Sequence, residues 1–248
     1  FTDYVSDPVV NLTLTGLVIA GGLGFYVLSD LYQKFESKRE HHLMFHSKIA
    51  IFTTIFLITS GALLIFLTEK DNPETLGKLG LSGKLWASYF QSVTARTAGF
   101  NTINTGALTN ASLLLVIMLM FIGASPGGTG GGIKTTTAAS LFYYVKATVQ
   151  RKEAVNIGSR RLPYETINKA VTIFIISSLF IIGITWLILL VEPFSSVNVA
   201  FEVVSAYGTV GLSTGITPLF SPISKYLLSL TMFTGRVGLL SLLLTFSM

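Results

Sequence analysis

Residues 97–102 read Thr-Ala-Gly-Phe-Asn-Thr, and residues 209–214 read Thr-Val-Gly-Leu-Ser-Thr. The two segments are 112 positions apart, and the same offset aligns 120–123 (Met-Phe-Ile-Gly) with 232–235 (Met-Phe-Thr-Gly). Nine of the 27 aligned positions from 97–123 and 209–235 are identical. Shared apolar composition does not place two polar Thr-x-Gly segments and two Met-Phe-x-Gly segments in one register. The chain therefore contains an internal repeat.

The composition around this repeat is that of a membrane protein. Hydrophobic residues make up 50% of the 248 positions and charged residues 12%, and the mean hydropathy is +0.66. An average soluble domain carries about 25% charged residues. There is no cysteine, which excludes disulfides, thiolate metal sites and cysteine nucleophiles. The chain opens at Phe1 without a signal-peptide pattern, and we expect a fragment of a longer protein.

Five stretches are long and apolar enough for the roughly 20 residues of helix that cross a bilayer. They are 8–31, 47–68, 107–145, 168–191 and 223–246. Two shorter apolar segments, 84–96 and 197–207, lead into the two Thr-x-Gly segments. Chain that enters a membrane and returns is tolerated only where it is buried in protein or lines a watery cavity.

This pattern predicts an all-α membrane protein of tandem helix–pore loop–helix repeats, similar in type to potassium channels, with a broken third span. We divide the chain into the last span of an earlier repeat (1–35), one repeat with a gate loop at 123–133 (36–166), and a further repeat (167–248).

Basic residues are concentrated in two of the connecting loops. One loop holds Lys34, Lys38, Arg39 and Lys48, and the other holds Lys146, Arg151, Lys152, Arg160, Arg161 and Lys169. Because cytoplasmic loops carry the excess of Lys and Arg, both loops should be cytoplasmic. This distribution also argues against a nucleic-acid-binding face as the source of the net charge of +5. The loop at 146–169 could dock an acidic cytosolic partner or anionic lipid, although topology alone explains its charge.

The repeated Thr-x-Gly segments have the chemistry of a cation filter. Backbone carbonyls can replace the water shell of a cation without burying fixed charge. Gly99 and Gly211 can adopt φ values closed to other residues, and Thr97 and Thr209 add hydroxyls. The negative C-terminal ends of the two short helices would point at the ion. We predict an ion-binding filter formed by Thr97, Ala98, Gly99, Phe100, Asn101, Thr209, Val210, Gly211, Leu212 and Ser213.

A dense run of helix breakers interrupts the third span. Residues 123–134 read Gly-Ala-Ser-Pro-Gly-Gly-Thr-Gly-Gly-Gly-Ile-Lys, and no intact helix tolerates this density. A nucleotide-binding P-loop would need Gly directly before Lys134, where the chain has Ile133. We predict instead a movable barrier below the filter, formed by Gly123, Ser125, Pro126, Gly127, Gly128, Thr129, Gly130, Gly131, Gly132, Lys134 and Arg236.

Several polar residues in the apolar segments leave alternatives open. Arg236 inside the fifth span should face gate-loop carbonyls or water, or form a helix-packing ion pair. Lys134 could meet a carboxylate or extend to the cytoplasmic interface. Arg96 and Glu202 beside the filter could brace the pore loops or attract cations. His41, His42 and His46 invite a metal site but fit a solvated interface better.

At residues 92–102 (Ser-Val-Thr-Ala-Arg-Thr-Ala-Gly-Phe-Asn-Thr) and 205–215 (Ser-Ala-Tyr-Gly-Thr-Val-Gly-Leu-Ser-Thr-Gly) the chain resembles the Trk/Ktr/HKT superfamily of potassium transporters. In that superfamily four tandem repeats surround one pore. The resemblance implies that residues 1–248 are the end of the second repeat with the third and fourth. Gly99 and Gly211 would then be two of four filter glycines, with K⁺ held by the backbone carbonyls of Thr97, Gly99, Thr209 and Gly211.

The resemblance further implies potassium transport with some sodium leakage across the bacterial plasma membrane. It assigns the intramembrane gate to the glycine-rich segment and Arg236. It implies a homodimer above a cytosolic nucleotide-binding regulatory ring, with the nucleotide bound by that partner and not by this chain. An enzyme is not expected, since no span carries a Ser/His, paired-aspartate or His-Glu-x-x-His group.

A secondary transporter that alternates access around a midplane site remains the alternative, because such proteins also use repeats and broken helices. Their repeats are often inverted, whereas the two repeats here share one orientation.

Overall fold

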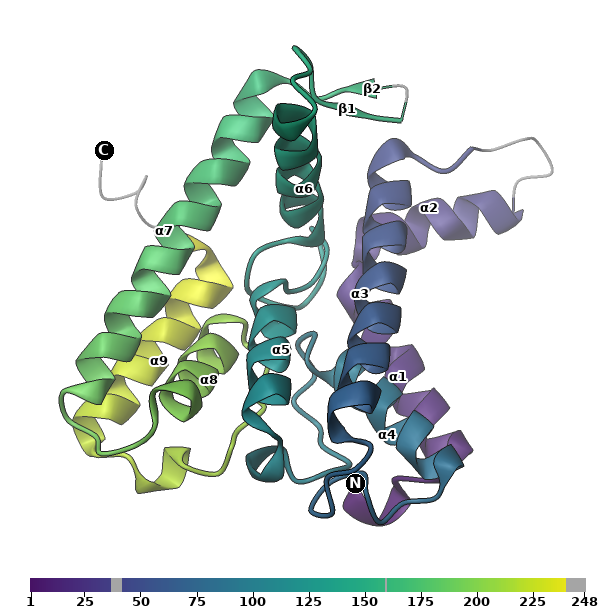
Figure 1. Ribbon diagram of the computed structural model, residues 1–248. Helices are drawn as coiled ribbons and strands as arrows, with labels where there is room; N and C mark the ends of the chain where they lie inside the picture. Colours follow the sequence, from purple (N-terminus) through teal and green to yellow (C-terminus); the bar gives the residue numbers. More distant parts are fainter. Residues whose placement is uncertain (37–41, 159, 240–248) are drawn as a thin grey trace.

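The computed structural model describes residues 1–36, 42–158 and 160–239 (Figure 1). The helices are α1 Pro8–Leu23, α2 Phe25–Glu36, α3 Phe45–Glu69, α4 Leu81–Thr94, α5 Asn110–Phe121, α6 Thr135–Val149, α7 Tyr164–Leu189, α8 Ser196–Tyr207 and α9 Pro222–Val237. A hairpin of β1 Asn156–Ile157 and β2 Arg160–Arg161, which the all-α prediction missed, joins α6 to α7.

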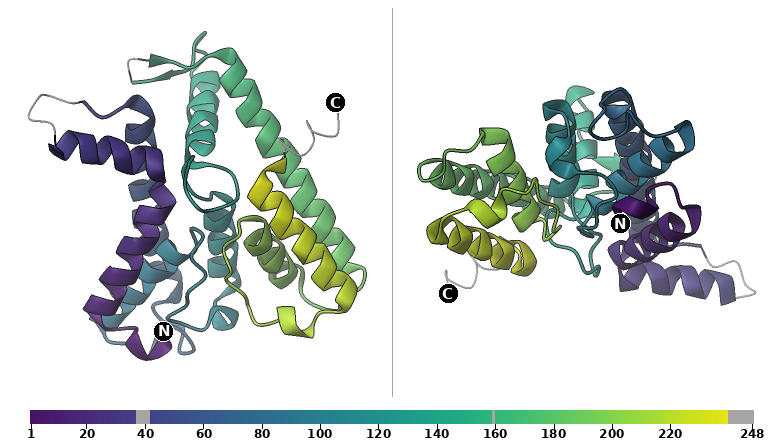
Figure 2. Two further views of the ribbon diagram at one scale, coloured as in Figure 1. Left: turned by 180° about the vertical axis from the view of Figure 1, so that it is seen from behind. Right: turned by 90° about the horizontal axis from the view of Figure 1, so that it is seen from below.

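The helices form two groups with a central pair between them. Figure 1 shows α1 to α4 on one side, α7 to α9 on the other, and α5 and α6 stacked in the middle; the views in Figure 2 agree. The start of α3 and the end of α6 lie at one end, and the connections α3 to α4 and α7 to α8 at the opposite end. The described parts of the two basic loops next to α3 and α6 are therefore on the same side, as the charge pattern predicts.

Among the described residues two helices, α3 and α7, are long and apolar enough to cross a membrane, and α1 with α2 would make a third if the bent pair counts as one span. The prediction of one continuous span over 8–31 is wrong. The helix stops at Gly24, whose φ of 81° and ψ of 161° lie outside the helical region, and α2 leaves at 103° to α1. The predicted span 107–145 contains α5 and α6 with irregular chain between them. The predicted span 223–246 contains α9, and its residues 240–246 lie outside the described residues.

The same order of elements occurs twice. A long helix is followed by a short helix, a glycine turn, a single 3-10 turn and another helix. The 3-10 turns, Thr105–Ala107 and Thr217–Leu219, differ by 112 positions, as do the starts of α5 and α9. The main hydrophobic core lies between these elements, with Ile65 of α3, Met120 of α5, Ile188 of α7 and Phe201 of α8 all fully buried.

A glutamate at the C-terminal end of each long helix, Glu69 for α3 and Glu192 for α7, binds the start of a later helix, α5 or α9. Glu69 accepts hydrogen bonds from the backbone N–H (2.9 Å) and hydroxyl (2.7 Å) of Thr109, which caps α5. Glu192 accepts from the N–H of Ser221 (2.8 Å) and the hydroxyl of Ser224 (2.7 Å) at the start of α9. Each carboxylate thereby meets N–H groups that a helix start leaves unpaired.

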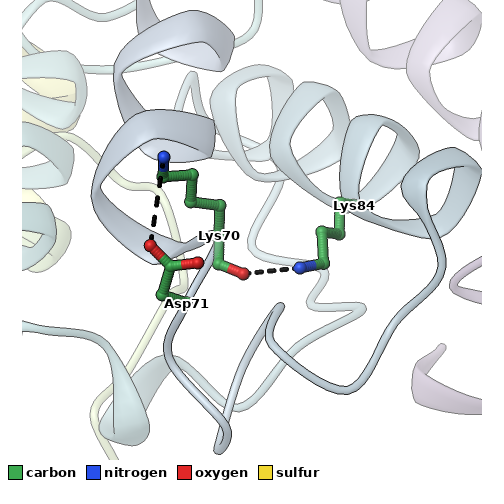
Figure 3. Close-up of polar contacts among 3 residues, drawn as sticks. All are labelled: Lys70, Asp71 and Lys84. Atoms are coloured by element: carbon green, nitrogen blue, oxygen red, sulfur yellow. Dashed lines mark hydrogen bonds and ion pairs between the residues drawn. The ribbon is translucent and has the colours of Figure 1, made fainter.

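A lysine holds the outer corner between α3 and α4 (Figure 3). Lys84, in the first turn of α4, donates from Nζ to the carbonyl oxygen of Lys70 at 2.6 Å. Lys70 follows the last residue of α3, so a cation meets the negative end of that helix. The ion pair of Lys70 with Asp71, 3.9 Å apart and exposed, adds little to stability.

The hydrogen bonds of Glu192 lead us to expect that the stability of the fold depends on pH. Hydrogen bonds from Ser221 and Ser224 hold the pKa of Glu192 below its ordinary value of 4.5. A carboxylate with a lowered pKa stabilises the fold above its unfolded pKa and loses that contribution as the pH falls through its folded pKa. We expect Glu192→Gln to lower the thermal unfolding midpoint in detergent at pH 7 and to reduce the loss of stability below about pH 4.5. Glu74→Gln, at an exposed position, should change neither the unfolding midpoint at pH 7 nor the loss of stability at low pH. Equal effects of the two variants would show that the hydrogen bonds of Glu192 to the start of α9 do not stabilise the fold.

Candidate functional site

Two glycine turns follow the C-terminal ends of the short helices α4 and α8. We call residues 97–101 the first glycine turn and residues 209–213 the second. Thr97 (φ 73°) and Gly99 (φ 75°) in the first match Thr209 (φ 52°) and Gly211 (φ 91°) in the second, all in the left-handed region. Alternation of positive φ directs successive carbonyls differently from a strand or helix. The same unusual backbone is therefore built twice, at the repeated sequence.

The backbones of the two turns face each other at close range. A Cβ atom on Gly99 would lie 3.0 Å from Cα and 3.1 Å from the carbonyl carbon of Gly211. A Cβ atom on Gly211 would lie 3.4 Å from Cα of Gly99. A Cβ atom on Gly99 would therefore collide with the second turn, whereas one on Gly211 would be in ordinary van der Waals contact with Gly99. Segments that are 112 positions apart in the chain thus meet at their central glycines.

Hydroxyls on the short helices orient one carbonyl of each turn. Thr94 donates to the carbonyl oxygen of Phe100 at 2.5 Å, and Ser205 donates to that of Leu212 at 2.6 Å. Each acceptor is the residue after the central glycine. Among the described residues, the carbonyl oxygens of 97–99 and 209–211 accept no hydrogen bond from the protein. The carbonyl oxygens without a donor are thus those of the first three residues of each turn.

Glu202 of α8 fixes the chain beyond the second glycine turn. Its carboxylate accepts from the hydroxyl of Ser213 (3.0 Å), from N–H (2.7 Å) and hydroxyl (2.8 Å) of Thr214, and from the hydroxyl of Thr217 (2.5 Å). Of the two roles considered for Glu202, these contacts support bracing. At the offset of 112 the matching residue is Phe90, and in the helix register that pairs Ser205 with Thr94 it is Gln91, whose side-chain amide has no hydrogen-bond partner among the described residues. The first turn therefore has no such brace.

Arg96 links the first glycine turn to the chain beyond α5. Its side chain is buried, with 6% exposed, and Nη2 donates to the carbonyl oxygen of Gly123 at 3.3 Å. Its Nε has no partner in the described part of the structure. In the second repeat the matching residue is Gly208, and there Gly235 of α9 packs directly on the backbone of Tyr207. Arg96 therefore occupies the space that the broken helix leaves open.

Residues 122–134 are irregular chain between α5 and α6, and we call residues 123–134 the glycine-rich loop. Its neck is closed by two hydrogen bonds, from Gly123 N–H to Ile133 O (2.9 Å) and from Ile133 N–H to Phe121 O (3.1 Å). The hydroxyls of Ser125 and Thr135 lie 2.9 Å apart across the loop base. The loop is thus a defined structure that returns to its starting point.

The glycine-rich loop lies directly against both glycine turns. The N–H of Gly131 donates to the hydroxyl of Thr209 at 2.9 Å. A Cβ atom on Gly130 would collide with the side chain of Thr97. The threonines that begin the two glycine turns therefore rest on neighbouring residues of the loop.

Two cationic side chains hold the loop by its carbonyl groups. Arg236 of α9 donates from Nη1 to the carbonyl oxygen of Thr129, a gate-loop partner as expected from sequence. Lys134 donates from Nζ to the carbonyl oxygen of Gly130 at 2.6 Å. Neither alternative considered for Lys134, a carboxylate partner or extension to the interface, matches this contact, because the loop folds its own carbonyl over the Lys134 side chain.

Sequence reasoning missed three features of this region. The hydroxyls of Thr94 and Ser205 differ in register by one residue, so the repeat alignment does not pair them. The hydrogen bonds of Glu69 and Glu192 to the starts of α5 and α9 have no signal in the local sequence. The contact between the glycine-rich loop and residues 21–25 joins segments about 100 positions apart and has no local signal beyond the glycines at 21, 22 and 24.

The histidines do not gather into a metal site. Within the described ranges no group of three or more His, Cys, Asp or Glu side chains is arranged to hold a metal ion. His41 lies outside the described residues.

Comparison with known proteins assigns the family. A family model described as a cation transport protein, TrkH, matches residues 1–248. The chain is 39% identical over 96% of its length to the Ktr system potassium uptake protein B of Vibrio alginolyticus, of which it covers 52%. It is 38% identical over 98% of its length to the protein of the same name in Bacillus subtilis, covering 54% of it. It is 35% identical over 93% of its length to the potassium/sodium uptake protein NtpJ of Enterococcus hirae, covering 51%.

A solved structure shares the fold. The potassium transporter TrkH from Vibrio parahaemolyticus superposes with a TM-score of 0.73 at 18% identity, over 95% of this chain and 51% of that one. The chain thus spans about half the length of the relatives it matches. Its long apolar helices and these relatives indicate a bacterial multi-pass membrane protein. By the family match over its full length, this chain is a member of the TrkH family of cation transport proteins.

Proposed function

We propose that this chain forms half of the wall of a potassium-uptake pore, in which the two glycine turns supply the selectivity filter. The observation that carries the proposal is the close approach of Gly99 and Gly211, together with the carbonyl oxygens of 97–99 and 209–211, which accept no hydrogen bond among the described residues. Backbone carbonyl oxygens without a donor in the protein can replace the water shell of a dehydrated cation. The relatives named for potassium uptake support K⁺ as the ion, and NtpJ supports some passage of Na⁺.

The filter in this proposal is narrower than the segment expected from sequence. Carbonyls of Thr97, Gly99, Thr209 and Gly211 coordinate K⁺, while those of Phe100 and Leu212 are held by Thr94 and Ser205. The hydroxyls act as positioning groups that keep the glycine peptides turned inward. The short helices end at Thr94 and Tyr207, immediately before the turns, so their negative ends add favourable potential.

The glycine-rich loop is the gate of this pore in our proposal. Support comes from its position against Thr97 and Thr209 and from its two cationic anchors, Arg236 and Lys134. A loop rich in glycine can change conformation at low cost, because no Cβ atoms restrict it. Loss of the Arg236 and Lys134 contacts would free the carbonyls of Thr129 and Gly130 and let the loop move aside.

The full protein in this proposal is a homodimer in the bacterial plasma membrane. A KtrA-like cytosolic ring, which binds the regulatory nucleotide, docks at the basic loops 34–48 and 146–169. A secondary cation symporter with alternating access remains the competing mechanism. Passive ⁸⁶Rb⁺ movement down its gradient in liposomes supports the pore, whereas a fixed coupling ratio to a second ion would support the symporter.

Substitution of a filter glycine should reduce ion selection. We expect Gly211→Ser, in the full-length protein in liposomes, to lower the preference for K⁺ over Na⁺, because a side chain at φ 91° strains the backbone whose carbonyl is proposed to coordinate the ion. Gly215→Ser is the matched control: its φ of 93° is equally positive, but a Cβ atom there meets nothing within 4 Å. Permeability ratios from competing K⁺ and Na⁺ flux measure the effect. Unchanged selectivity in Gly211→Ser, or an equal change in Gly215→Ser, would overturn the filter assignment.

Shortening the gate should raise passive flux. Deletion of residues 128–130 removes the carbonyls that Arg236 and Lys134 hold and withdraws the loop from Thr97. We expect faster ⁸⁶Rb⁺ uptake into liposomes without a regulatory partner. Arg236→Gln should act in the same direction. Lys225→Gln, a cation on the same helix that donates to Pro218 instead, should not. Wild-type flux after the deletion would remove the gate from the proposal.

A further inference from the structure

The break between α1 and α2 is fitted to the glycine-rich loop. Gly24 sits at the corner with φ 81°, and a Cβ atom there would lie 2.6 Å from the N atom of Gly128, 2.7 Å from the carbonyl carbon of Gly127 and 2.9 Å from the carbonyl oxygen of Pro126. These distances leave no room for any side chain. We call residues 21–25 the elbow.

Backbone hydrogen bonds join the elbow to the loop in both directions. The N–H of Ser125 donates to the carbonyl oxygen of Gly22 at 2.9 Å, and that of Thr129 to the carbonyl oxygen of Gly21 at 3.4 Å. In return the N–H of Phe25 donates to the carbonyl oxygen of Gly127 at 3.2 Å. The end of α1 offers free carbonyls and the start of α2 a free N–H, as helix termini do. The loop uses both.

The first turn of α2 also touches the loop through a side chain. A Cβ atom on Gly127 would lie 2.6 Å from Cδ2 of the Tyr26 ring. From this point α2 runs away at 103° to α1, and Figure 1 shows it extending sideways beyond α3. Asp30 of α2 accepts from the N–H of Met44 at 2.8 Å, which ties α2 to the start of α3 beside a basic loop. Movement of α2 would therefore change its contacts with the glycine-rich loop.

We propose that the elbow is the seat of the glycine-rich loop, and that α2 is the element whose displacement releases it. The inference rests on the proposed gate and adds the residues that set its closed position. Closure then depends on two opposite supports: the cations Arg236 and Lys134 hold the loop carbonyls of Thr129 and Gly130, and the elbow holds the backbone between 125 and 129. Displacement of α2 would withdraw the Phe25 N–H and the Tyr26 ring together.

A pair of substitutions at Phe25 isolates one seat hydrogen bond. Phe25→Pro removes the N–H donor, yet proline is well tolerated at the first position of a helix. Phe25→Ala removes the exposed ring and keeps the N–H, so it is the matched control. We expect Phe25→Pro to raise passive ⁸⁶Rb⁺ flux of the full-length protein about fivefold above that of Phe25→Ala, the factor for one lost hydrogen bond. Both variants lose the ring that packs on Tyr26, so the difference between them reports the N–H donor alone.

A second pair tests the shape of the seat. Gly24→Ala places a methyl group against Gly127 and Gly128, whereas a Cβ atom on Gly22 meets nothing within 4 Å. We expect Gly24→Ala, and not Gly22→Ala, to loosen the loop. A cysteine introduced at position 129, in a full-length background from which any other cysteine has been removed, reports loop release directly, as an increased rate of modification by a water-soluble thiol reagent.

The two readouts separate this inference from the proposed gate. Faster modification together with higher flux in Phe25→Pro and Gly24→Ala supports both. Faster modification with unchanged flux keeps the seat and overturns the gate. Unchanged modification, when the loop deletion does raise flux, overturns the seat and leaves the gate intact. Equal effects in the control variants overturn the seat as well.

Discussion

Backbone groups at membrane depth have no water to bind, and this constraint bears on each irregular segment that lies beside the proposed pore. The glycine turns and the glycine-rich loop are the irregular segments next to the proposed pore. The loop pairs its N–H and carbonyl groups with the elbow, with Thr209, with Arg236 and with Lys134. The glycine turns instead leave the carbonyls of 97–99 and 209–211 without donors among the described residues, and on this difference we base the proposal that the turns, and not the loop, bind the ion.

The two repeats solve the same packing problem in different ways. In the second, Gly235 lets the continuous helix α9 press on the backbone of Tyr207, and Glu202 fixes the chain after the turn. In the first, α5 ends at Phe121, Arg96 reaches Gly123, and Phe90 stands where the second repeat has Glu202. The second glycine turn is thus braced by side chains of its own repeat, whereas the first is connected to the glycine-rich loop, which in our proposal is the part that moves.

Rigidity elsewhere allows that one loop to move. The outer carboxylates Glu69 and Glu192 fasten each long helix to the helix after the turn, and the buried hydroxyl of Ser92 donates to Ile58 O at 2.9 Å, which locks α4 onto α3. These contacts lie around the glycine turns, not in the glycine-rich loop. In our proposal these helix contacts keep the carbonyl groups of the glycine turns in place while the glycine-rich loop moves.

The sequence by itself determined the elements that depend on local chemistry. Apolar length predicted α3 and α7, the repeat register predicted matching turns, and helix breakers predicted irregular chain at 123–134. Only the tertiary structure decided the partners: Thr94 with Phe100, Arg96 with Gly123, and the elbow with the loop. Glycine permits many conformations, so a run of glycines says that the chain turns but not what it rests on. Spacing and hydropathy record the order of residues along the chain, whereas a hydrogen bond between residues about 100 positions apart depends on the packing that brings them together.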